Sequence, residues 1–456
     1  MKKKWRRFLS NLLNKDKDGY IIFENHKIKK GEIYNKINEF SSVLLSNKIK
    51  NGAIVYISLK TGYPFIVSFF SCLIVGAIPI LNSENKDNET GLSADLSITQ
   101  DIITSDIYWF NNFHYLINRK ILKKNTKYKI NSSFFIHTSG STNKSKCIGV
   151  SYNNIIYNIK THRFLKFNSF PLISVLPWTH IFGLFFDLFL SLYFKLNIIR
   201  VNKPNEIYLL PELENKLFHY YINGVPKFFE DIINSNRGSI LSNVRGGIVG
   251  GARISSELAK YLKDSNFRIG YGQTEATPGI LMGKKGEFHP NYLGEKIGID
   301  IKLKKNRLYF KGKNSFTEQI IEGKILNYKK NRWVNSKDIC ITINDKYFYV
   351  GRIDFSFKLS NGKMIYSEEI ESNLIREIGL KHPIQIGENN LLGIYLMIDK
   401  KEENKNDLIL NTLPNYLRSE KIKIIFVSEW SKDSKGNLNR NKMVENYLLV
   451  YKRQNN

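Results

Sequence analysis

A loop rich in hydroxyl groups is the first stretch of this sequence with the residues for chemistry. Residues 137–152 read HTSGSTNKSKCIGVSY and follow the apolar run Phe134–Ile136. The hydroxyl-bearing residues and the glycine among them are Thr138, Ser139, Gly140, Ser141 and Thr142. Hydroxyl and backbone N–H groups in such a turn can surround a phosphate, and Lys144 and Lys146 add positive charge. The sequence therefore predicts a phosphate-binding loop.

Three common motifs do not fit this loop. A Walker loop requires glycine immediately before its Lys-Ser pair, and Asn143 stands before Lys144-Ser145. The serine of a G-x-S-x-G hydrolase elbow is absent, and so is a dinucleotide-binding G-x-G-x-x-G. A polar surface turn remains the alternative for the loop taken alone.

Further motifs follow in an order that resembles the adenylate-forming superfamily. They are Gly76–Pro79 (GAIP), Leu176–Gly183 (LPWTHIFG), Gly250–Ala252 (GGA), Tyr271–Glu275 (YGQTE), Asp338 after Trp333, Gly351–Asp354 (GRID) and Glu368–Glu371 (EEIE). The superfamily includes acyl- and aryl-CoA synthetases, luciferase and nonribosomal peptide adenylation domains. The resemblance spans about residues 30–445. YGQTE matches the family pattern fully, whereas Asn143, Ser145 and Cys147 replace the glycine, proline and glycine of the family's loop.

The resemblance implies a reaction in two halves. A carboxylate attacks the α-phosphorus of ATP and expels pyrophosphate; a thiol then attacks the acyl adenylate and expels AMP. Thr138–Thr142 and Lys146 would hold the pyrophosphate, and Thr274 the α-phosphate. Glu275 would bind Mg²⁺, a hard cation that prefers oxygen ligands.

The resemblance also implies a nucleotide pocket. Tyr271 and Gly272 would cover the adenine, with Gly250, Gly251 and Ala252 permitting close backbone approach. Asp338 would accept hydrogen bonds from the ribose hydroxyls, and Arg352 would help to hold the nucleotide. Each residue also has a purely structural interpretation: Glu275 as a helix-start carboxylate, Asp338 as a turn residue and Arg352 as a surface ion pair.

His180 bears on the acid that is activated. Amino-acid-activating relatives usually carry an aspartate in this segment, whereas His180 precedes a run of apolar residues. The pattern favours an acyl or aryl carboxylic acid without an amino group. Asp187 is predicted to be a helix residue facing solvent, with an amino-group anchor as its alternative. The thiol acceptor is either coenzyme A or the phosphopantetheine of an acyl carrier protein.

The C-terminal region departs from the family at one position. The family's P-x-T-x-x-G-K-x-x-R motif corresponds here to residues 431–440, SKDSKGNLNR, in which Gly436 and Arg440 align and Asn437 replaces the lysine. Loss of one such charge-directed contact costs about 3–4 kcal/mol of transition-state stabilisation. Lys435 is a candidate replacement. Three interpretations stay open: a complete ligase, an enzyme for one half-reaction, and a non-catalytic nucleotide- or acyl-binding member of a biosynthetic complex.

The order of elements predicts an α/β fold that positions these motifs. Buried strands are expected at 53–59, 77–81, 134–136 and 172–176, and helices at 33–45, 64–75, 155–165, 182–193 and 257–262. Short strands with an Asn-Asp turn follow from 302 to 350. We therefore expect an N-terminal AMP-binding domain of layered sheets with a β-rich subdomain (1–350), and a small mobile α+β domain (351–456) that hinges near Asp354.

Composition narrows the location and partners of the protein. The 456 residues are 42% hydrophobic, enough for a large core. Cys72, Cys147 and Cys340 lie far apart, so neither disulfides nor a zinc site is expected, and a cytoplasmic location is predicted. The net charge of +28 is spread along the chain without a nucleic-acid-binding motif, which argues against nucleic acid as the main ligand.

The N-terminus is predicted to form an amphipathic basic helix. Trp5, Phe8, Leu9, Leu12 and Leu13 fall on one face, with lysines and arginines opposite. We expect this face to pack on its own domain rather than on a membrane.

Overall fold

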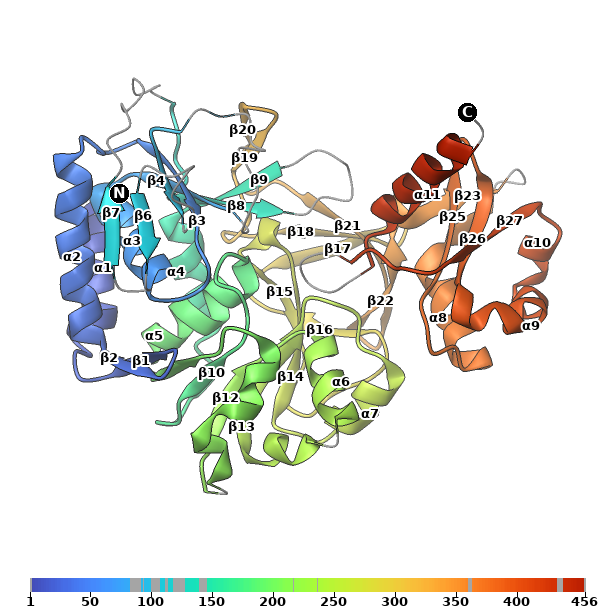
Figure 1. Ribbon diagram of the computed structural model, residues 1–456, viewed down its shortest axis with the longest axis horizontal. Coiled ribbons are helices and arrows are strands. Elements are labelled where there is room, and N and C mark those ends of the chain that lie inside the picture. Colours follow the sequence, from blue (N-terminus) through green and yellow to red (C-terminus); the bar gives the residue numbers. More distant parts are fainter. Residues whose placement is uncertain are drawn as a thin grey trace. The chain divides into compact units, whose positions relative to one another are not determined.

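Two compact units make up the protein (Figure 1). The computed structural model describes residues 2–82, 92, 94–99, 107–110, 114–117, 128–138, 146–215, 217–235, 237–359, 363–432 and 438–454. The large unit comprises Met1–Asp300 and Phe310–Val334, and the small unit comprises Ile301–Tyr309 and Asn335–Asn456. Both mix helices with sheets, which confirms the predicted α/β class.

One sheet of the large unit has a parallel centre. Its order is β2-β1-β11-β10-β12-β13-β14-β15-β16. The bounds are β1 Tyr20–Phe23, β2 His26–Lys29, β10 Leu172–Ser174, β11 Ile198–Arg200, β12 Tyr220–Asn223, β13 Val244–Gly250, β14 Phe267–Gly272, β15 Gly279–Met282 and β16 Tyr292–Lys296. The strands from β1 to β14 in this order run parallel, so their carboxyl ends meet at one edge of the sheet.

The second sheet of the large unit has the order β20-β19-β9-β8-β4-β3-β5-β6-β7. The bounds are β3 Ile54–Ser58, β4 Ile78–Leu81, β5 Leu96–Thr99, β6 Ile107–Phe110, β7 His114–Ile117, β8 Phe134–Thr138, β9 Lys146–Val150, β19 Glu318–Ile321 and β20 Lys324–Asn327. β8 and β9 form an antiparallel pair in which Thr138 lies opposite Lys146. This pair therefore carries the two ends of the hydroxyl-rich loop.

Helices cover these sheets. They are α1 Lys2–Leu9, η1 Ser10–Asn14, α2 Lys30–Ser46, α3 Tyr63–Val75, α4 Tyr152–Thr161, η2 Gly183–Leu190, α5 Ser191–Tyr193, α6 Pro226–Asn234 and α7 Ser256–Leu262; short 3₁₀ turns occupy Pro204–Leu209, Pro211–Glu214 and Gly238–Asn243. α3 is buried along its whole length because it lacks charged residues, and Gly76 ends it in the left-handed conformation. It confirms the predicted helix at 64–75. Across the described ranges, the longest apolar helices fall short of a membrane span.

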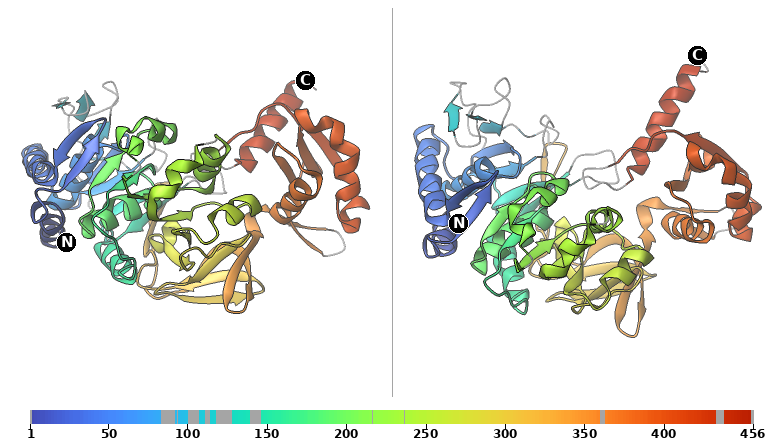
Figure 2. Two further views of the ribbon diagram at one scale, coloured as in Figure 1. Left: turned by 90° about the horizontal axis from the view of Figure 1, so that it is seen from below. Right: turned by 60° about the horizontal axis from the view of Figure 1, so that its bottom comes forward.

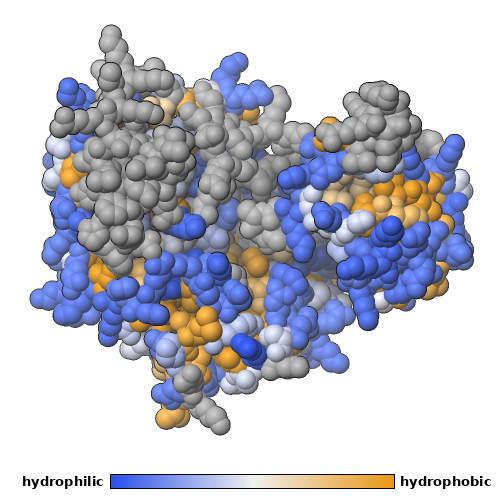
Figure 3. Space-filling view, in the orientation of Figure 1, coloured by the Kyte–Doolittle hydropathy of each residue, from blue (hydrophilic) through white to orange (hydrophobic). Residues whose placement is uncertain are grey.

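The N-terminal helix packs within the large unit, as predicted. Trp5 is 1% exposed, and its indole N–H donates to the Ser133 hydroxyl at 2.9 Å. The apolar face of η1 is buried as well, through Leu12 and Leu13. The basic side chains of α1 point away from this core, and on the face drawn in Figure 3 hydrophilic residues predominate.

The small unit has two parts. The first contains β17 Asp300–Lys304, β18 Arg307–Lys311, β21 Val334–Ile343 and β22 Lys346–Arg352, in the order β17-β18-β21-β22. Asn344 and Asp345 have φ values of 49° and 59°, which suits the tight turn of the predicted hairpin. The short helix η7, Ile353–Phe355, follows β22 and contains Asp354.

The second part is a three-stranded sheet between helices (Figures 1 and 2). Its elements are β23 Ser356–Lys358, β24 Met364–Tyr366, α8 Ser367–Ile378, β25 Ile384–Asn389, β26 Gly393–Asp399, η8 Lys400–Lys405, α9 Asn406–Thr412, α10 Asn415–Arg418, β27 Ile422–Val427 and α11 Arg440–Gln454. Alternate residues of β26 face opposite sides. Leu396 and Ile398 pack with α8 and α9, and Met397 packs with Met443 of α11.

Candidate functional site

The GGA and YGQTE segments meet at the carboxyl edge of the parallel sheet. Gly250 ends β13 and lies in register with Gly270 of β14. A Cβ at Gly250 would stand 2.2 Å from the Gly270 carbonyl oxygen, so a larger residue cannot fit there. Gly251 adopts a φ of +83°, which glycine tolerates best. The sequence therefore turns sharply at the edge where ligands of parallel sheets usually bind.

A polar network fixes the turn that carries Glu275. Thr274–Ala276 form the short helix η6 immediately after β14, and the Glu275 carbonyl accepts from the Phe316 N–H at 2.9 Å. Asn158 of α4 donates to the Ala276 carbonyl at 3.2 Å, and Asn314 donates to the Gly279 carbonyl at 2.8 Å. Sequence reasoning missed both asparagines, because each is distant from YGQTE along the chain and belongs to no motif.

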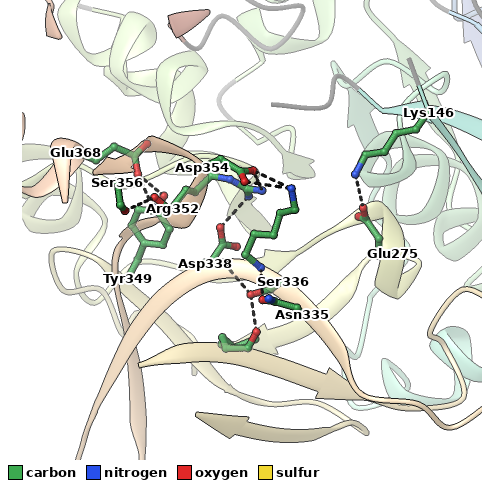
Figure 4. A network of polar contacts seen from close by, with 12 residues as sticks. Lys146, Glu275, Asn335, Ser336, Asp338, Tyr349, Arg352, Asp354, Ser356 and Glu368 are labelled. Carbon is green, nitrogen blue, oxygen red and sulfur yellow. Dashed lines mark hydrogen bonds and ion pairs between the residues drawn. The ribbon is translucent and has the colours of Figure 1, made fainter. Parts of the chain in front are cut away.

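Lys146 and Glu275 come together within the large unit (Figure 4). The Lys146 Nζ lies 3.3 Å from Glu275 Oε1, and both side chains keep about a fifth of their surface exposed, at 23% and 19%. The Thr138 hydroxyl donates to the Lys146 carbonyl at 3.3 Å across the β8–β9 pair. Ser139, Gly140, Ser141 and Thr142 lie outside the described residues. Two residues predicted for the phosphate and magnesium site are thus adjacent, 129 positions apart in the chain.

Asp338 and Arg352 form an ion pair within the small unit. They stand opposite each other in the β21–β22 hairpin, with Arg352 Nη1 2.8 Å from Asp338 Oδ1. Asp354 lies 3.7 Å from Arg352 Nη2 and 3.1 Å from Lys337 Nζ. Figure 4 shows Asp338, Arg352 and Asp354 grouped together. Asp338 is only 4% exposed and Arg352 29% exposed, so this is more than a surface pair. A carboxylate held rigidly in this way can accept hydrogen bonds from hydroxyl groups.

His180 lies in a tightly held turn after β10. The His180 N–H donates to the Pro177 carbonyl at 3.2 Å, and its own carbonyl accepts from Leu184 at the start of η2. The Trp178 N–H donates to Thr61 Oγ1 at 2.8 Å. These bonds hold a half-buried His180 where apolar residues of η2 begin.

The prediction that Asp187 faces solvent is wrong. Asp187 is fully buried, and its carboxylate accepts from Ser174 Oγ at 2.9 Å and from Asn223 Nδ2 at 2.8 Å. Burial raises the pKa of Asp187 to about 7 and lowers the pKa of the nearby Arg200 to about 10. The sequence of the helix did not reveal that Asp187 is buried, because the polar groups that stabilise its carboxylate, Ser174 and Asn223, lie far from it in the chain.

Burial of His162 predicts a pH-dependent loss of stability. The ring is fully buried at the end of α4, its Nδ1 donates to the Asn158 carbonyl at 2.7 Å, and burial lowers its pKa to about 4. The unfolded chain binds this proton near pH 6.5, so the folded state loses stability as pH falls from 6.5 to 4. We expect roughly 3 kcal/mol to be lost over this range. Urea unfolding of the wild type and His162→Gln should show a steeper acid dependence for the wild type. Parallel profiles for the two, with exposed His289→Gln as a control, would contradict the assignment.

Glu371 and Arg440 anchor the C-terminal motif. Arg440 Nη1 donates to Glu371 Oε1 at 2.7 Å, a second contact joins Nη2 to Oε2, and the two side chains are 10% and 6% exposed. A bridge between Lys432 and Leu438 brackets the intervening segment. Lys435 and Asn437 lie in that segment, outside the described residues. The pair joins Arg440 to the EEIE segment, a contact that the sequence alone did not reveal.

Comparisons with known proteins test the predicted family resemblance. The family model described as "AMP-binding enzyme" matches residues 100–306, which include the hydroxyl-rich loop, His180, GGA and YGQTE. This match confirms the predicted resemblance to the adenylate-forming superfamily over that part of the chain.

Individual relatives are distant. The chain is 26% identical over 193 residues to a feruloyl-CoA synthase from an Amycolatopsis species, covering 36% of this chain and 37% of that protein. It is 24% identical over 284 residues to gramicidin S synthase 2 from Brevibacillus brevis, covering 56% of this chain and 6% of that protein. The chain thus spans only 37% of the length of the first of these curated relatives and 6% of the length of the second.

Solved structures resemble nearly the whole chain. ATP-bound MatB from Rhodopseudomonas palustris has a TM-score of 0.80 at 16% identity, covering 98% of this chain and 99% of its own. o-Succinylbenzoate CoA synthetase (MenE) from Bacillus subtilis, in complex with an acyl-adenylate, has a TM-score of 0.73 at 15% identity, covering 96% and 97%. At this identity the likeness establishes the fold.

Proposed function

We propose that this protein is an ATP-dependent carboxylic acid–thiol ligase. It would activate an acyl or aryl carboxylic acid as its adenylate and transfer the acyl group to a thiol. The observation that carries the proposal is the Lys146–Glu275 contact of 3.3 Å beside the carboxyl edge of β13 and β14. The names of similar proteins, feruloyl-CoA synthase and o-succinylbenzoate CoA synthetase among them, support the acyl- or aryl-CoA synthetase class.

The residues at this edge suit ATP and magnesium. Among the residues that the structure describes, no group of three or more His, Cys, Asp or Glu residues is placed so that it could hold a metal ion. Glu275 would share Mg²⁺ with phosphate oxygens, because Mg²⁺ in nucleotide sites is commonly bound by one or two carboxylates together with phosphates. Mg²⁺ would offset charge on the phosphates. Tyr271, Gly272 and Gly250–Ala252 would surround the adenine, and Thr274 the α-phosphate. Relatives solved with ATP, and with ATP and magnesium, support this assignment.

The remaining groups would bind the ribose, the acid, the reacting phosphate and the thiol. Asp338 would accept from the ribose hydroxyls while Arg352 keeps it in place. His180 would contact the acid, and Lys435 would approach the reacting phosphate. CoA or a carrier-protein phosphopantetheine would supply the thiol. The similarity to gramicidin S synthase 2 supports a carrier protein as the source. We place the protein in the cytoplasm, since Cys72, Cys147 and Cys340 lie far apart in the sequence and are all buried.

A half-reaction is the second candidate function, and Asn437 is the observation that favours it. Asparagine donates hydrogen bonds but carries no charge, so stabilisation of the developing negative charge would be weaker. Thioester formation from an adenylate made by another enzyme would depend less on a positive charge at position 437. The third interpretation, a non-catalytic member of a biosynthetic complex, predicts tight nucleotide binding without turnover.

Replacing Lys146 by alanine should weaken ATP use more than AMP binding. Lys146 would contact the pyrophosphate, which AMP lacks, so only the triphosphate loses a charge-assisted contact. Such a contact contributes about 1.5–3 kcal/mol, so the Kd for ATP should rise roughly 10- to 100-fold. Titration with ATP and with AMP measures the difference, and Lys160→Ala, in α4 of the same unit, serves as a control. Equal losses for the two nucleotides would argue against the pyrophosphate role.

The nucleotide assignment is tested by calorimetric titration with an acyl-sulfamoyl adenosine, a stable mimic of an acyl adenylate. Binding to the wild type, weakened in Gly250→Val, is the expected result, because the valine side chain would collide with the Gly270 carbonyl. If neither this mimic nor AMP binds the wild type, the proposed function is wrong.

A further inference from the structure

Three neighbouring strands of the large unit's parallel sheet end in polar residues. Ser174 ends β10, Arg200 ends β11 and Asn223 ends β12. Ser174 is in register with both Arg200 and Asn223, so the three residues stand in a row. They are at most 7% exposed, although none of them is apolar. Because the strands are parallel, this buried polar row lies at the carboxyl edge of the sheet, as Gly250 and Gly270 do.

The carboxylate of Asp187, in η2, binds this row. One oxygen, Oδ2, accepts from Ser174 Oγ at 2.9 Å and from the Leu176 N–H at 3.3 Å. The other oxygen, Oδ1, accepts from Asn223 Nδ2 at 2.8 Å. Asp187 is fully buried, so both oxygens are used inside the protein. A carboxylate enclosed in this way is not available to bind the amino group of a substrate.

Arg200 binds the same segment of the backbone. Its Nη1 donates to the Ser174 carbonyl at 2.8 Å and to the Leu176 carbonyl at 2.9 Å. Leu176 therefore has its N–H bound by Asp187 and its carbonyl bound by Arg200. Hydrogen bonds of this kind, made between buried groups, fix the direction in which the chain leaves β10.

The turn that carries His180 begins at this point. Trp178 donates from Nε1 to Ser174 Oγ at 3.1 Å, and the His180 N–H donates to the Pro177 carbonyl at 3.2 Å. A Cβ at Gly183 would stand 2.3 Å from that same carbonyl oxygen, so the start of η2 packs directly against the turn. The placement of His180 thus depends on the buried polar groups that precede the turn.

Asn223 extends the network to the strand that ends at Gly250. Its Oδ1 accepts from the Ile248 N–H at 2.9 Å, and Ile248 lies in β13 just before that end. The Gly250 N–H in turn donates to the Gly224 carbonyl at 3.1 Å. These bonds connect the His180 turn to the edge where the nucleotide residues stand, within one unit.

We propose that Asp187, together with Ser174, Arg200 and Asn223, is a positioning residue for the acid that this protein activates. It acts through the His180 turn, whose distance from the nucleotide edge decides whether the carboxylate of the acid reaches the α-phosphate. Reacting atoms must approach to about 3–3.5 Å, and a misplacement of about 1 Å can cost roughly 100-fold in rate. This inference rests on the proposed function, in which His180 contacts the acid.

Hydrogen exchange of the full chain, measured by mass spectrometry, tests the positioning without any substrate. Whichever way the new amide of Asp187→Asn turns, its NH₂ group meets a donor, either Asn223 Nδ2 or the Leu176 N–H. The backbone amides of residues 176–184 should therefore exchange about tenfold faster, as expected when a buried hydrogen bond is lost. Adding Asn223→Asp swaps the two groups, restores each donor–acceptor pair and should restore the wild-type rate.

A matched control changes a second buried aspartate of the same unit. Asp95 accepts from the Ile54 N–H at 2.8 Å in the other sheet. Asp95→Asn should leave the exchange of residues 176–184 unchanged. Should Asp187→Asn fail to fold, Ser174→Ala takes its place, because it removes one donor from the same carboxylate. Circular dichroism verifies that each variant is folded.

Calorimetric titration tests the effect on the acid. The probes are AMP and two mimics of an acyl adenylate, benzoyl- and dodecanoyl-sulfamoyl adenosine, of which the tighter is followed in the variants. Asp187→Asn should raise the Kd for the mimic about tenfold and leave the Kd for AMP within about twofold, with recovery on adding Asn223→Asp. In a His180→Ala background, Asp187→Asn should change the Kd for the mimic by less than about twofold, because the residue through which it acts is gone.

The outcomes separate the inference from the function on which it rests. If neither AMP nor either mimic binds the wild type, the proposed function is wrong and the inference falls with it. If they bind, the inference alone is wrong when exchange of residues 176–184 is unchanged in Asp187→Asn or is not restored by Asn223→Asp. It is also wrong when the mimic keeps its affinity, or loses as much affinity in the His180→Ala background as in the wild type.

Discussion

Replacing Glu275 by glutamine should reduce magnesium-dependent ATP–pyrophosphate exchange by about two to three orders of magnitude. Glutamine keeps the size of the side chain but removes the charge that would bind Mg²⁺, and it also leaves Lys146 without its partner at 3.3 Å. Losing one preorganised electrostatic contact to the reacting phosphates typically costs about 3–4 kcal/mol. AMP binding should change little, because AMP needs no metal at the β- and γ-phosphates.

Measuring exchange over a range of Mg²⁺ concentrations distinguishes a lost metal ligand from a lost fold. Glu257→Gln, at an exposed position of α7, is the matched control. An exchange rate in Glu275→Gln within about tenfold of the wild type, equivalent to less than about 1.4 kcal/mol, would remove Glu275 from the metal site.

Replacing Asp338 by asparagine should destabilise the small unit and weaken nucleotide binding together. Breaking a buried ion pair by removing one partner costs about 3–5 kcal/mol. Arg352 keeps 29% of its side chain exposed, so we expect a loss of roughly 2–3 kcal/mol. The Kd for AMP should rise about 10- to 100-fold, because the ribose would lose a charged acceptor.

Thermal unfolding and AMP titration measure the two effects on the same variant. Asp345→Asn changes the same residue type at the exposed turn of the same hairpin and should alter neither. A variant at Asp338 that loses stability but binds AMP normally would make Asp338 a structural residue only. One that binds AMP and unfolds as the wild type does would refute both roles.

Much of the fold follows from local patterns in the sequence. The uncharged run ending at Gly76 specifies α3, because Pro64 fits the first turn and Gly76 the left-handed cap. The Asn344-Asp345 pair specifies the hairpin that sets Asp338 opposite Arg352. Such features depend on residues that are neighbours in the chain, so they can be predicted from a single sequence.

The rest depends on contacts between residues far apart in the chain. The buried Asp187 carboxylate accepts from Ser174, Leu176 and Asn223, and the apolar residues around it in the sequence do not indicate these donors. Asn158 and Asn314 hold the Glu275 turn from two different segments.

ATP–pyrophosphate exchange, measured with a panel of carboxylic acids, tests the central claim most directly. The panel should include monocarboxylic acids, aryl acids and elongated dicarboxylic acids, with Asn437→Lys assayed beside the wild type. The ligase proposal predicts magnesium-dependent exchange by the wild type with at least one acid, stronger in Asn437→Lys. Absence of exchange by the wild type with every acid, together with its appearance in Asn437→Lys, would contradict a complete ligase and leave a half-reaction or binding role.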